Sequence, residues 1–282
     1  MVSLADAFKI LFFWSVDSDK QTQDLVKANV DFVKAHGGSD CCDVMLSHYK
    51  GQPADWDAEW YNQHVVQNRV GPGYKFKALK ELYNKKDVCD KWETLYEWVW
   101  AMDADIDIRG VDLDRFFKLA RDSTSLIISP TFTGDPAQWT VFNSLLEATE
   151  TDSTNHQINV IGKPDDKCKF RHTTYVEMTC PLLHGLALNS LFDDSQCEHC
   201  IGDKAEWGLD RIWCNRVKKA VGGIEFPCAY IDGDDKGDQT VLHLDWKTAQ
   251  VNQDFSQSEN EVRNHYPADF EIIKALDCVP RK

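Results

Sequence analysis

The sequence has no apolar run long enough to cross a membrane: no stretch approaches the ~18 consecutive apolar residues that a spanning helix requires. Its early apolar stretch, Lys9–Trp14, is followed at once by the polar residues Ser15–Asp19, so we expect no secretory signal. Positive charge is also scarce, with 31 lysine and arginine residues against 46 aspartate and glutamate residues. The formal net charge of −15 argues against nonspecific binding to nucleic acid or to anionic membranes, which require a basic face.

Several fingerprints of cofactor and nucleophile chemistry are missing as well. The sequence contains neither G-x-x-x-x-G-K-[ST] nor G-x-G-x-x-G, which argues against P-loop and Rossmann cofactor binding. It contains no G-x-S-x-G elbow for an activated serine. Any nucleotide chemistry must therefore use another kind of site.

Cysteine, in contrast, is plentiful, with 10 residues. Because no signal peptide is recognisable, we expect reduced thiols in a soluble cytoplasmic protein rather than a disulfide framework. Cys197 and Cys200 have the spacing of a metal knuckle, but a structural zinc site usually needs a second pair. Cys168 and Cys180 are the nearest candidates and lie 12 positions apart, so buried thiols are favoured over zinc.

The first half of the chain alternates between strand and helix patterns. Lys9–Trp14 is predicted as a buried strand, Gln21–His36 as an amphipathic helix ended by two glycines, and Cys42–Tyr49 as a second strand. A β–α–β opening indicates a parallel sheet built by right-handed crossovers. The alternation continues to about residue 135, which predicts an α/β fold with a mostly parallel central sheet and helices on both faces.

The second half is less regular. Pro181–Phe192 is predicted as a helix begun by proline, and Asp269–Leu276 as a weak helix near the end. No internal repeat and no Pro- or Ser-rich linker occurs, so we expect one domain over residues 1–282 with a smaller second lobe. Within it we distinguish a nucleotide-binding half (8–135), an acceptor and catalytic half (136–250) and a C-terminal tail (251–282).

The chain is organised around Tyr96–Ile108, where a short aromatic and β-branched strand ends in Asp103-Ala104-Asp105. Hard divalent cations prefer oxygen ligands, and phosphate-handling sites hold them through one or two carboxylates plus the substrate phosphates. The carboxyl ends of strands are also where open α/β sheets bind nucleotides. Because Asp-x-Asp recurs elsewhere in this acidic chain, the alternative is a solvated loop with helix-capping carboxylates.

Five further residues are candidates, each with a structural alternative. Ser15 and Asp17 follow the first strand, where a carboxylate can bind a ribose or a pyrimidine, but they also suit a helix-capping loop. Lys75 begins a basic helix and is a candidate phosphate ligand, unless that helix face is simply solvated. Asp210, with Glu206, opens a helix and is either a capping group or a general base. A lone histidine such as His243 is more often structural.

Five segments occur in an order that resembles a known family. They are V-M-L-S-H-Y-K-G (44–51), the aromatic strand into D-A-D (98–105), V-E-M-T-C-P-L-L (176–183), W-G-L-D (207–210) and V-L-H-L (241–244). This pattern resembles the GT-A-type glycosyltransferases that chloroviruses encode to build capsid glycans, and a related plant family with a GT-A-like pattern. The resemblance covers roughly residues 8–250.

The resemblance implies a GT-A fold, a nucleotide-sugar donor, and Mn²⁺ or Mg²⁺ bridging the donor diphosphate to the carboxylates of Asp103 and Asp105, which makes both of them metal ligands. By that likeness Asp103 would lie near the donor ribose and sugar, Asp105 would be the more direct metal ligand, and His243 would supply a further ligand. A third acid, Asp107, makes the choice of metal pair ambiguous.

The same resemblance assigns Asp210 as the catalytic base of an inverting enzyme and places Ser15 and Asp17 in the uridine-binding loop. It implies transfer from a UDP-sugar, with UDP-xylose the best guess, to a hydroxyl of an oligosaccharide or glycoprotein, in capsid N-glycan synthesis in the host cytoplasm. A retaining reaction stays open. We expect no nucleic-acid partner and no membrane insertion. The alternatives are a nucleotidyltransferase and a glycan-binding module without turnover.

Overall fold

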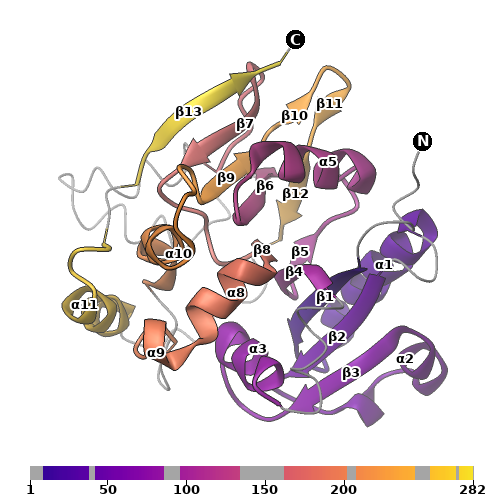
Figure 1. Cartoon of the computed structure of the whole chain (residues 1–282). Helices are drawn as coiled ribbons and strands as arrows, with labels where there is room; N and C mark the ends of the chain where they lie inside the picture. Colours follow the sequence, from indigo (N-terminus) through magenta and orange to yellow (C-terminus); the bar gives the residue numbers. More distant parts are fainter. Residues whose placement is uncertain are drawn as a thin grey trace. The chain divides into compact units, whose positions relative to one another are not determined.

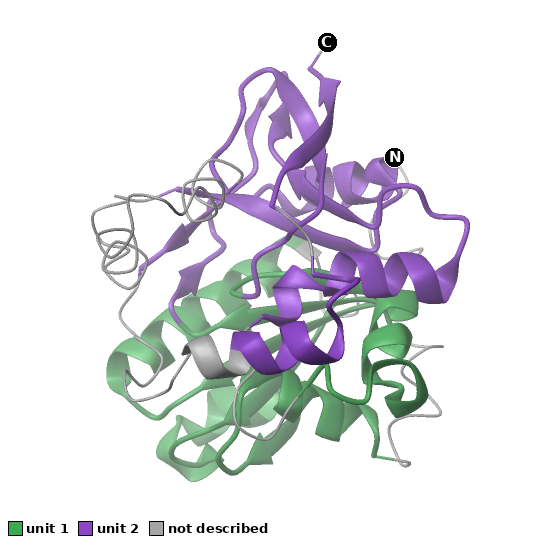
Figure 2. Ribbon diagram, turned by 90° about the vertical axis from the view of Figure 1, so that its left-hand side faces the viewer, with its two compact units in different colours: residues 1–104, 179–206 green, residues 105–178, 207–282 purple. Residues whose placement is uncertain are grey.

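The chain forms two compact units, which Figure 2 shows in different colours. Unit 1 comprises Met1–Ala104 and Thr179–Glu206, and unit 2 comprises Asp105–Met178 and Trp207–Lys282. The boundary therefore falls inside the Asp-Ala-Asp motif, and the division at residue 135 stays a prediction. The computed structural model describes residues 9–37, 42–85, 96–133, 162–201, 208–244, 255–270 and 273–281.

Unit 1 is built on a sheet in which β1 lies between β2 and β4, both parallel to it. Strand β3 adds to β2 in parallel, and β8 adds to β4 in antiparallel fashion. The apolar run of β1 is buried from Ile10 to Val16, as expected for a strand covered on both faces. The strands are β1 (Lys9–Val16), β2 (Cys42–His48), β3 (Val65–Val70), β4 (Tyr96–Asp103) and β8 (Leu182–His184).

The helices of unit 1 join and cover these strands (Figure 1). Helix α1 connects β1 to β2, which confirms the β–α–β opening. Indoles fill the core: Trp14 and Trp100 are fully buried, and Phe12 lies 5.6 Å from Trp100 between ring centroids. The helices are α1 (Lys20–Gly37), η2 (Pro53–Asp55), α2 (Ala58–His64), α3 (Lys75–Tyr83), α8 (Gly185–Phe192) and α9 (Asp194–Cys197).

In unit 2, β6 is flanked by two parallel strands, β9 and β12. Strand β7 pairs antiparallel with β9, β13 with β7, and β5 with β12. The strands are β5 (Ile106–Asp107), β6 (Ile127–Thr133), β7 (Cys168–Thr173), β9 (Cys228–Ile231), β10 (Gly233–Asp234), β11 (Gly237–Asp238), β12 (Thr240–His243) and β13 (Ala275–Pro280). The predicted α/β class with parallel strands at the centre is confirmed.

The helical segments among the described residues of unit 2 are α5 (Leu113–Ser123), η4 (Leu209–Arg211), α10 (Trp213–Val221) and α11 (Phe255–His265). Helix α5 starts where the Asp112 side chain accepts a hydrogen bond from the Arg115 amide, and it buries Phe116 and Phe117. No helix within the described residues of either unit combines the length and the apolarity needed to cross a bilayer.

Two local predictions were wrong. Pro181–Phe192 is not one helix, because Leu182–His184 forms β8 against β4 before α8 begins at Gly185. Near the C-terminus, Ala275–Pro280 is strand β13 rather than the end of a weak helix. In both places the hydrogen bonds offered by a neighbouring strand outweigh the local helix propensity.

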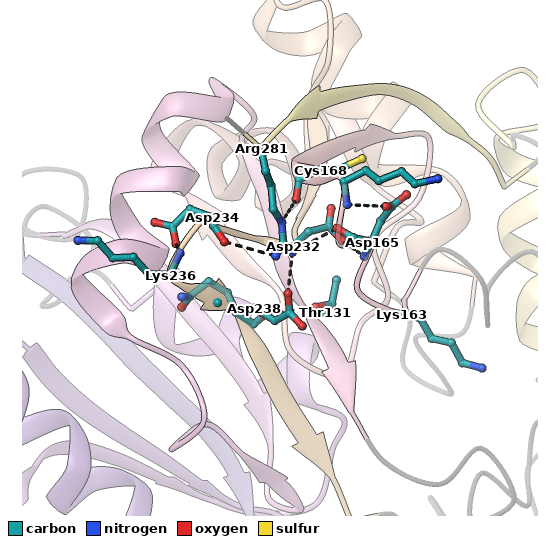
Figure 3. Close-up of polar contacts among 12 residues, drawn as sticks. Thr131, Lys163, Asp165, Cys168, Asp232, Asp234, Lys236, Asp238 and Arg281 are labelled. Atoms are coloured by element: carbon teal, nitrogen blue, oxygen red, sulfur yellow. Dashed lines mark hydrogen bonds and ion pairs between the residues drawn. The ribbon is translucent and has the colours of Figure 1, made fainter.

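A network of ion pairs and hydrogen bonds ties the C-terminal end of β13 into unit 2 (Figure 3). Arg281 donates to the carbonyl of Cys168 at 2.8 Å and to the carboxylate of Asp238 at 2.7 Å. Beneath it, the buried Asp232 accepts two hydrogen bonds from Arg171, at 2.9 and 2.8 Å. Arg281 thus joins the end of β13 to β7 and to the β10–β11 hairpin, and the buried Arg171–Asp232 pair joins β7 to the end of β9.

The expectation of reduced thiols was wrong. Cys168 and Cys278 form a disulfide between β7 and β13, and Cys214 and Cys228 form another between α10 and β9. A third bond joins the knuckle cysteines, Cys197–Cys200, which removes both thiolates from any zinc site. Pairing across 110 positions follows from the antiparallel register of β7 and β13, which sequence spacing does not reveal.

Replacing Cys278 with alanine should lower the free energy of unfolding by about 3 kcal/mol, because the bond to Cys168 closes a long loop in the unfolded chain. Urea denaturation of the variant and the unaltered protein without reductant measures the difference. In excess dithiothreitol the two proteins should unfold at the same urea concentration. Equal midpoints without reductant would show that this disulfide does not stabilise the protein.

Candidate functional site

The first cluster of predicted site residues lies in unit 1, at the carboxyl ends of its parallel strands. Ser15 on β1 is in register with Asp103 on β4, so the two positions are neighbours across the ladder. Asp17 follows directly and is buried. Its carboxylate accepts hydrogen bonds from the Tyr49 hydroxyl at 3.2 Å and from the Asp19 amide at 3.1 Å. The nucleoside loop predicted from the sequence therefore has a fixed, buried carboxylate.

Lys75 lies in the same cluster, at the first position of α3. Its ammonium group is 2.9 Å from the Asp103 carboxylate and donates a hydrogen bond to the Thr179 carbonyl at 3.1 Å. The Lys75 side chain is buried, whereas that of Asp103 is 39% exposed. The structure thus brings Ser15, Asp103 and Lys75 together. The lysine expected to face a phosphate is paired with the first carboxylate of the motif.

The second cluster lies in unit 2 and joins Asp105 to His243. Strand β12 pairs with β5 so that His243 is opposite Ile106, and the Leu244 amide donates to the Asp105 carbonyl at 3.0 Å. As a result, His243 Nε2 lies 3.6 Å from Asp105 Oδ2. The Asp105 side chain is 3% exposed and that of His243 is 15% exposed. This short antiparallel pairing brings together two residues that are far apart in the sequence.

The chemistry of this pair fits a divalent cation. A carboxylate oxygen and an imidazole nitrogen at this separation need to move only slightly to bind one ion at the usual distance of about 2.1 Å. No group of three or more His, Cys, Asp or Glu side chains gathers as a ready-made metal site within the ranges that the structure describes. Two protein ligands are nonetheless sufficient where diphosphate oxygens and waters complete the coordination.

The contacts of Asp107 bear on the ambiguity over the third acid. Asp107 is engaged by Arg109, which donates to its carboxylate from Nε at 2.9 Å, from Nη2 at 2.6 Å and from the backbone amide at 3.0 Å. A carboxylate held by a two-pronged guanidinium is already neutralised, so it is a poor metal ligand. Asp107 is therefore a weaker candidate ligand than Asp105.

The predicted base, Asp210, lies in a third cluster, also in unit 2. It belongs to the one-turn helix η4, which begins after Gly208, whose φ of +97° suits glycine. The Asp210 carboxylate accepts a hydrogen bond from the buried Tyr175 hydroxyl at 2.9 Å. Burial raises the pKa of Asp210 to about 7, the Tyr175 hydrogen bond opposes this rise, and the charge of Glu177 adds to it. Such a group exchanges a proton near neutral pH.

Glu177 is a further carboxylate beside this cluster. It is half-buried, and its backbone amide donates to the Tyr230 hydroxyl at 3.0 Å. Burial first, and then charges that include that of Glu177, raise the pKa of Tyr230. Glu177 is therefore close enough to act on the same environment as Asp210. Glu206 lies outside the described residues.

The sequence did not identify Tyr175, the direct partner of Asp210. The two residues are 35 positions apart, and no spacing rule links them. Tyr49 was included in a predicted strand without a role, although it orients Asp17. In both cases the signal is a hydrogen bond that exists only once the strands are assembled.

No protein-family model and no curated protein sequence matches the chain. Solved structures do resemble it, at 11% identity. The likeness to a mannosyltransferase from Pyrobaculum calidifontis, in complex with GDP-Man and Mn²⁺, covers 93% of this chain and 63% of that chain, at a TM-score of 0.46. The likeness to a mycobacterial protein covers 93% of this chain and 76% of that chain, at a TM-score of 0.50.

A third similar structure is glucosyl-3-phosphoglycerate synthase from Mycobacterium tuberculosis, in complex with Mn²⁺, UDP and glucosyl-3-phosphoglycerate. The likeness covers 99% of this chain and 90% of that chain, at a TM-score of 0.50 and 11% identity. Similarity at this identity establishes architecture rather than activity. The chain has the fold of the GT-A-type glycosyltransferases.

Proposed function

We propose that the protein is a metal-dependent glycosyltransferase that moves a sugar from a nucleoside diphosphate sugar to an acceptor hydroxyl with inversion. The observation that carries the proposal is the pairing of the buried Asp105 carboxylate with His243, directly after the strand that ends in Asp103. The synthase with which the chain shares its fold was solved with Mn²⁺ and UDP, which supports the same ligand class here.

The residues of unit 1 would bind the donor. Asp17, held by Tyr49, offers a fixed carboxylate to the hydroxyl or N–H groups of the nucleoside. Lys75 offsets the charge of Asp103 and so limits repulsion between that carboxylate and a diphosphate. Ser15 adds a small polar side chain beside Asp103 in the strand register.

The residues of unit 2 would hold the ion and activate the acceptor. Asp105 and His243 would bind the divalent cation, which would neutralise charge on the departing nucleoside diphosphate. Asp210 would take the proton of the acceptor hydroxyl, and Tyr175 would hold its carboxylate in one orientation. A single displacement at the anomeric carbon inverts its configuration.

The finer assignments rest on the ordered sequence motifs. UDP-xylose is the proposed donor, and an oligosaccharide or glycoprotein, as in chlorovirus capsid N-glycans, is the proposed acceptor. Location is a separate matter: the sequence favours the cytoplasm, whereas Cys168–Cys278 and Cys214–Cys228 favour an oxidising compartment. Alkylation of thiols in intact cells, followed by counting the blocked cysteines, distinguishes the two locations.

Isothermal calorimetry with UDP-xylose, UDP-glucose, UDP-galactose and GDP-sugars tests the proposal. Each donor is titrated with Mn²⁺, with Mg²⁺ and with EDTA. We expect one donor to bind in the presence of the cation and to lose that binding in EDTA, because the diphosphate needs the ion to approach two carboxylates. Binding that EDTA leaves unchanged would contradict the proposed site.

Reaction products separate the alternatives. A glycosyltransferase with the wrong acceptor should slowly release UDP and free sugar from its donor in a Mn²⁺-dependent reaction. A nucleotidyltransferase should instead release pyrophosphate from a nucleoside triphosphate. A glycan-binding module should bind oligosaccharide with or without the cation and release neither product.

A further inference from the structure

Helix α11, in the tail that the sequence motifs do not cover, lies directly against the loop that carries Asp210. A Cβ atom added to Gly208 would be 3.1 Å from Glu259 Cα and 3.4 Å from Val262 Cβ. Val262 is 5% exposed, so this contact is buried. Gly208 therefore permits both the left-handed turn before η4 and the close approach of α11.

A stack of two guanidinium groups and one ring fixes the other end of η4. The Arg211 guanidinium lies 4.7 Å from the centroid of the Phe270 ring, and Arg263 of α11 lies 4.4 Å from the same centroid. Cation–π contacts of this kind are favourable and directional. Because Arg211 directly follows Asp210, the Phe270 ring limits how far the base can move.

Helix α10 anchors this C-terminal segment. The Asp269 side chain is 4% exposed and pairs with Arg216 at 3.2 Å and with Lys219. The Asn215 side chain donates to the Asp269 carbonyl at 3.1 Å. A buried carboxylate with two cationic partners is costly to pull out, so Phe270, its neighbour, has a fixed position.

The charges around Asp210 come from several elements. Tyr175 and Glu177 face it from the segment after β7, Arg211 from η4 itself and Glu259 from α11. Glu259 is half-buried and lies 3.5 Å from Arg263, so it is a negative charge placed by the helix. After burial, Glu177 and Glu259 both favour the protonated form of Asp210, whereas Tyr175 and Arg211 favour its ionised form.

We propose that the segment Phe255–Phe270 is a positioning element for Asp210, in which Phe270 holds the loop through Arg211 and the part of α11 that carries Glu259 packs against Gly208. The assignment rests on the proposed function, in which Asp210 is the base. It gives the C-terminal segment a role in the reaction rather than in folding alone. Neither residue is placed in contact with the reacting atoms.

Glu259→Gln tests the electrostatic part. Removing this negative charge should move the titration of the Asp210 carboxyl to lower pH, because one of the charges that favour its protonated form is lost. Infrared difference spectroscopy of ¹³C-aspartate-labelled protein, with Asp210→Asn to identify the band, follows that titration without any substrate. Glu261→Gln is the matched control, since Glu261 carries the same charge on the exposed face of α11.

Phe270→Leu tests the geometric part while it keeps an apolar side chain. The Asp210 titration should again move toward the ordinary carboxyl range, as the loosened loop admits water. Mn²⁺-dependent hydrolysis of UDP-xylose should fall about tenfold in kcat with little change in KM, since a small misplacement of the base affects the chemical step alone. Phe226→Leu, which removes a half-buried ring stacked on His172, should leave both unchanged.

An Asp210 titration that is the same in Glu259→Gln, Phe270→Leu and the unaltered protein would overturn this inference. That result is distinct from failure of the proposed function. If Asp210→Asn keeps full turnover, the base assignment is wrong. If the Asp210 titration still moves in Glu259→Gln, the control of its proton affinity by α11 stands.

Discussion

Asp210→Asn should lower the rate of sugar transfer by about 1,000-fold, because a positioned general base contributes roughly 10²- to 10⁴-fold to such a step. The amide keeps the size of the carboxylate and can still accept the Tyr175 hydrogen bond, so the local structure should be preserved. Affinity for UDP with Mn²⁺, measured by calorimetry, should be nearly unchanged. Steady-state kinetics with the donor and acceptor pair gives the turnover number.

The same assignment predicts the pH dependence of turnover. With a pKa of about 7, Asp210 becomes increasingly protonated as the pH falls below that value, and a protonated carboxyl cannot take a proton from the acceptor. The turnover number should therefore fall about tenfold per pH unit on the acid side. A turnover number that stays constant down to about pH 5 would exclude a base with this pKa.

Thermal unfolding shows whether the Asp210→Asn variant is folded. The pKa of Asp210 is raised in the folded state, so its contribution to stability is fully present below the ordinary aspartate pKa and is lost as the pH rises through about 7. Asp210→Asn cannot ionise, so it should unfold at a higher temperature than the unaltered protein at about pH 8, with a smaller difference at about pH 5. A base retained at a cost in stability is typical of functional sites.

Loss of UDP binding in Asp210→Asn would point to a different arrangement. Asp210 would then belong to the donor site, and Glu177 would become the better candidate for the base, since it is half-buried and next to the same tyrosines. Glu177→Gln, measured in the same two assays, then identifies the base. Reduced transfer with intact UDP binding is the result expected of it.

Local sequence patterns were sufficient to predict the strands that are buried and consist of one continuous apolar run. The apolar run of β1 and the two glycines at the end of the predicted helix define the β–α–β opening without knowledge of any partner. Strand β8, in contrast, is only Leu182–His184, and it is a strand because β4 offers it a ladder. A three-residue segment contains too little periodicity to distinguish a strand from the first turn of a helix.

Local sequence patterns also predicted only part of the candidate site. Asp103 and Asp105 stand out because a strand and a loop predict their position, and Asp17 because it follows the first strand. His243 is a strong candidate ligand only because β12 pairs with β5, which places it beside Asp105 although the two residues are 138 positions apart. The contacts of α11 with Gly208 depend on tertiary packing in the same way, so sequence patterns alone gave the tail no role.

Asp105→Ala should abolish cation-dependent donor binding, because it removes the more buried of the two proposed metal ligands. We expect affinity for Mn²⁺ in the presence of UDP to fall more than about 100-fold, whereas His243→Ala should weaken it by about 10- to 100-fold. Electron paramagnetic resonance of free Mn²⁺ gives both affinities without any turnover. It is therefore independent of the acceptor.

The matched control is Asp107→Asn, two positions along the chain. Its carboxylate is engaged by Arg109 rather than available to an ion, so this variant should bind Mn²⁺ and UDP as the unaltered protein does. Should Asp107→Asn lose the ion while folded Asp105→Ala retains it, the carboxylate ligand would have to be reassigned from Asp105 to Asp107. The Arg109 pairing would then be a contact that the ion displaces.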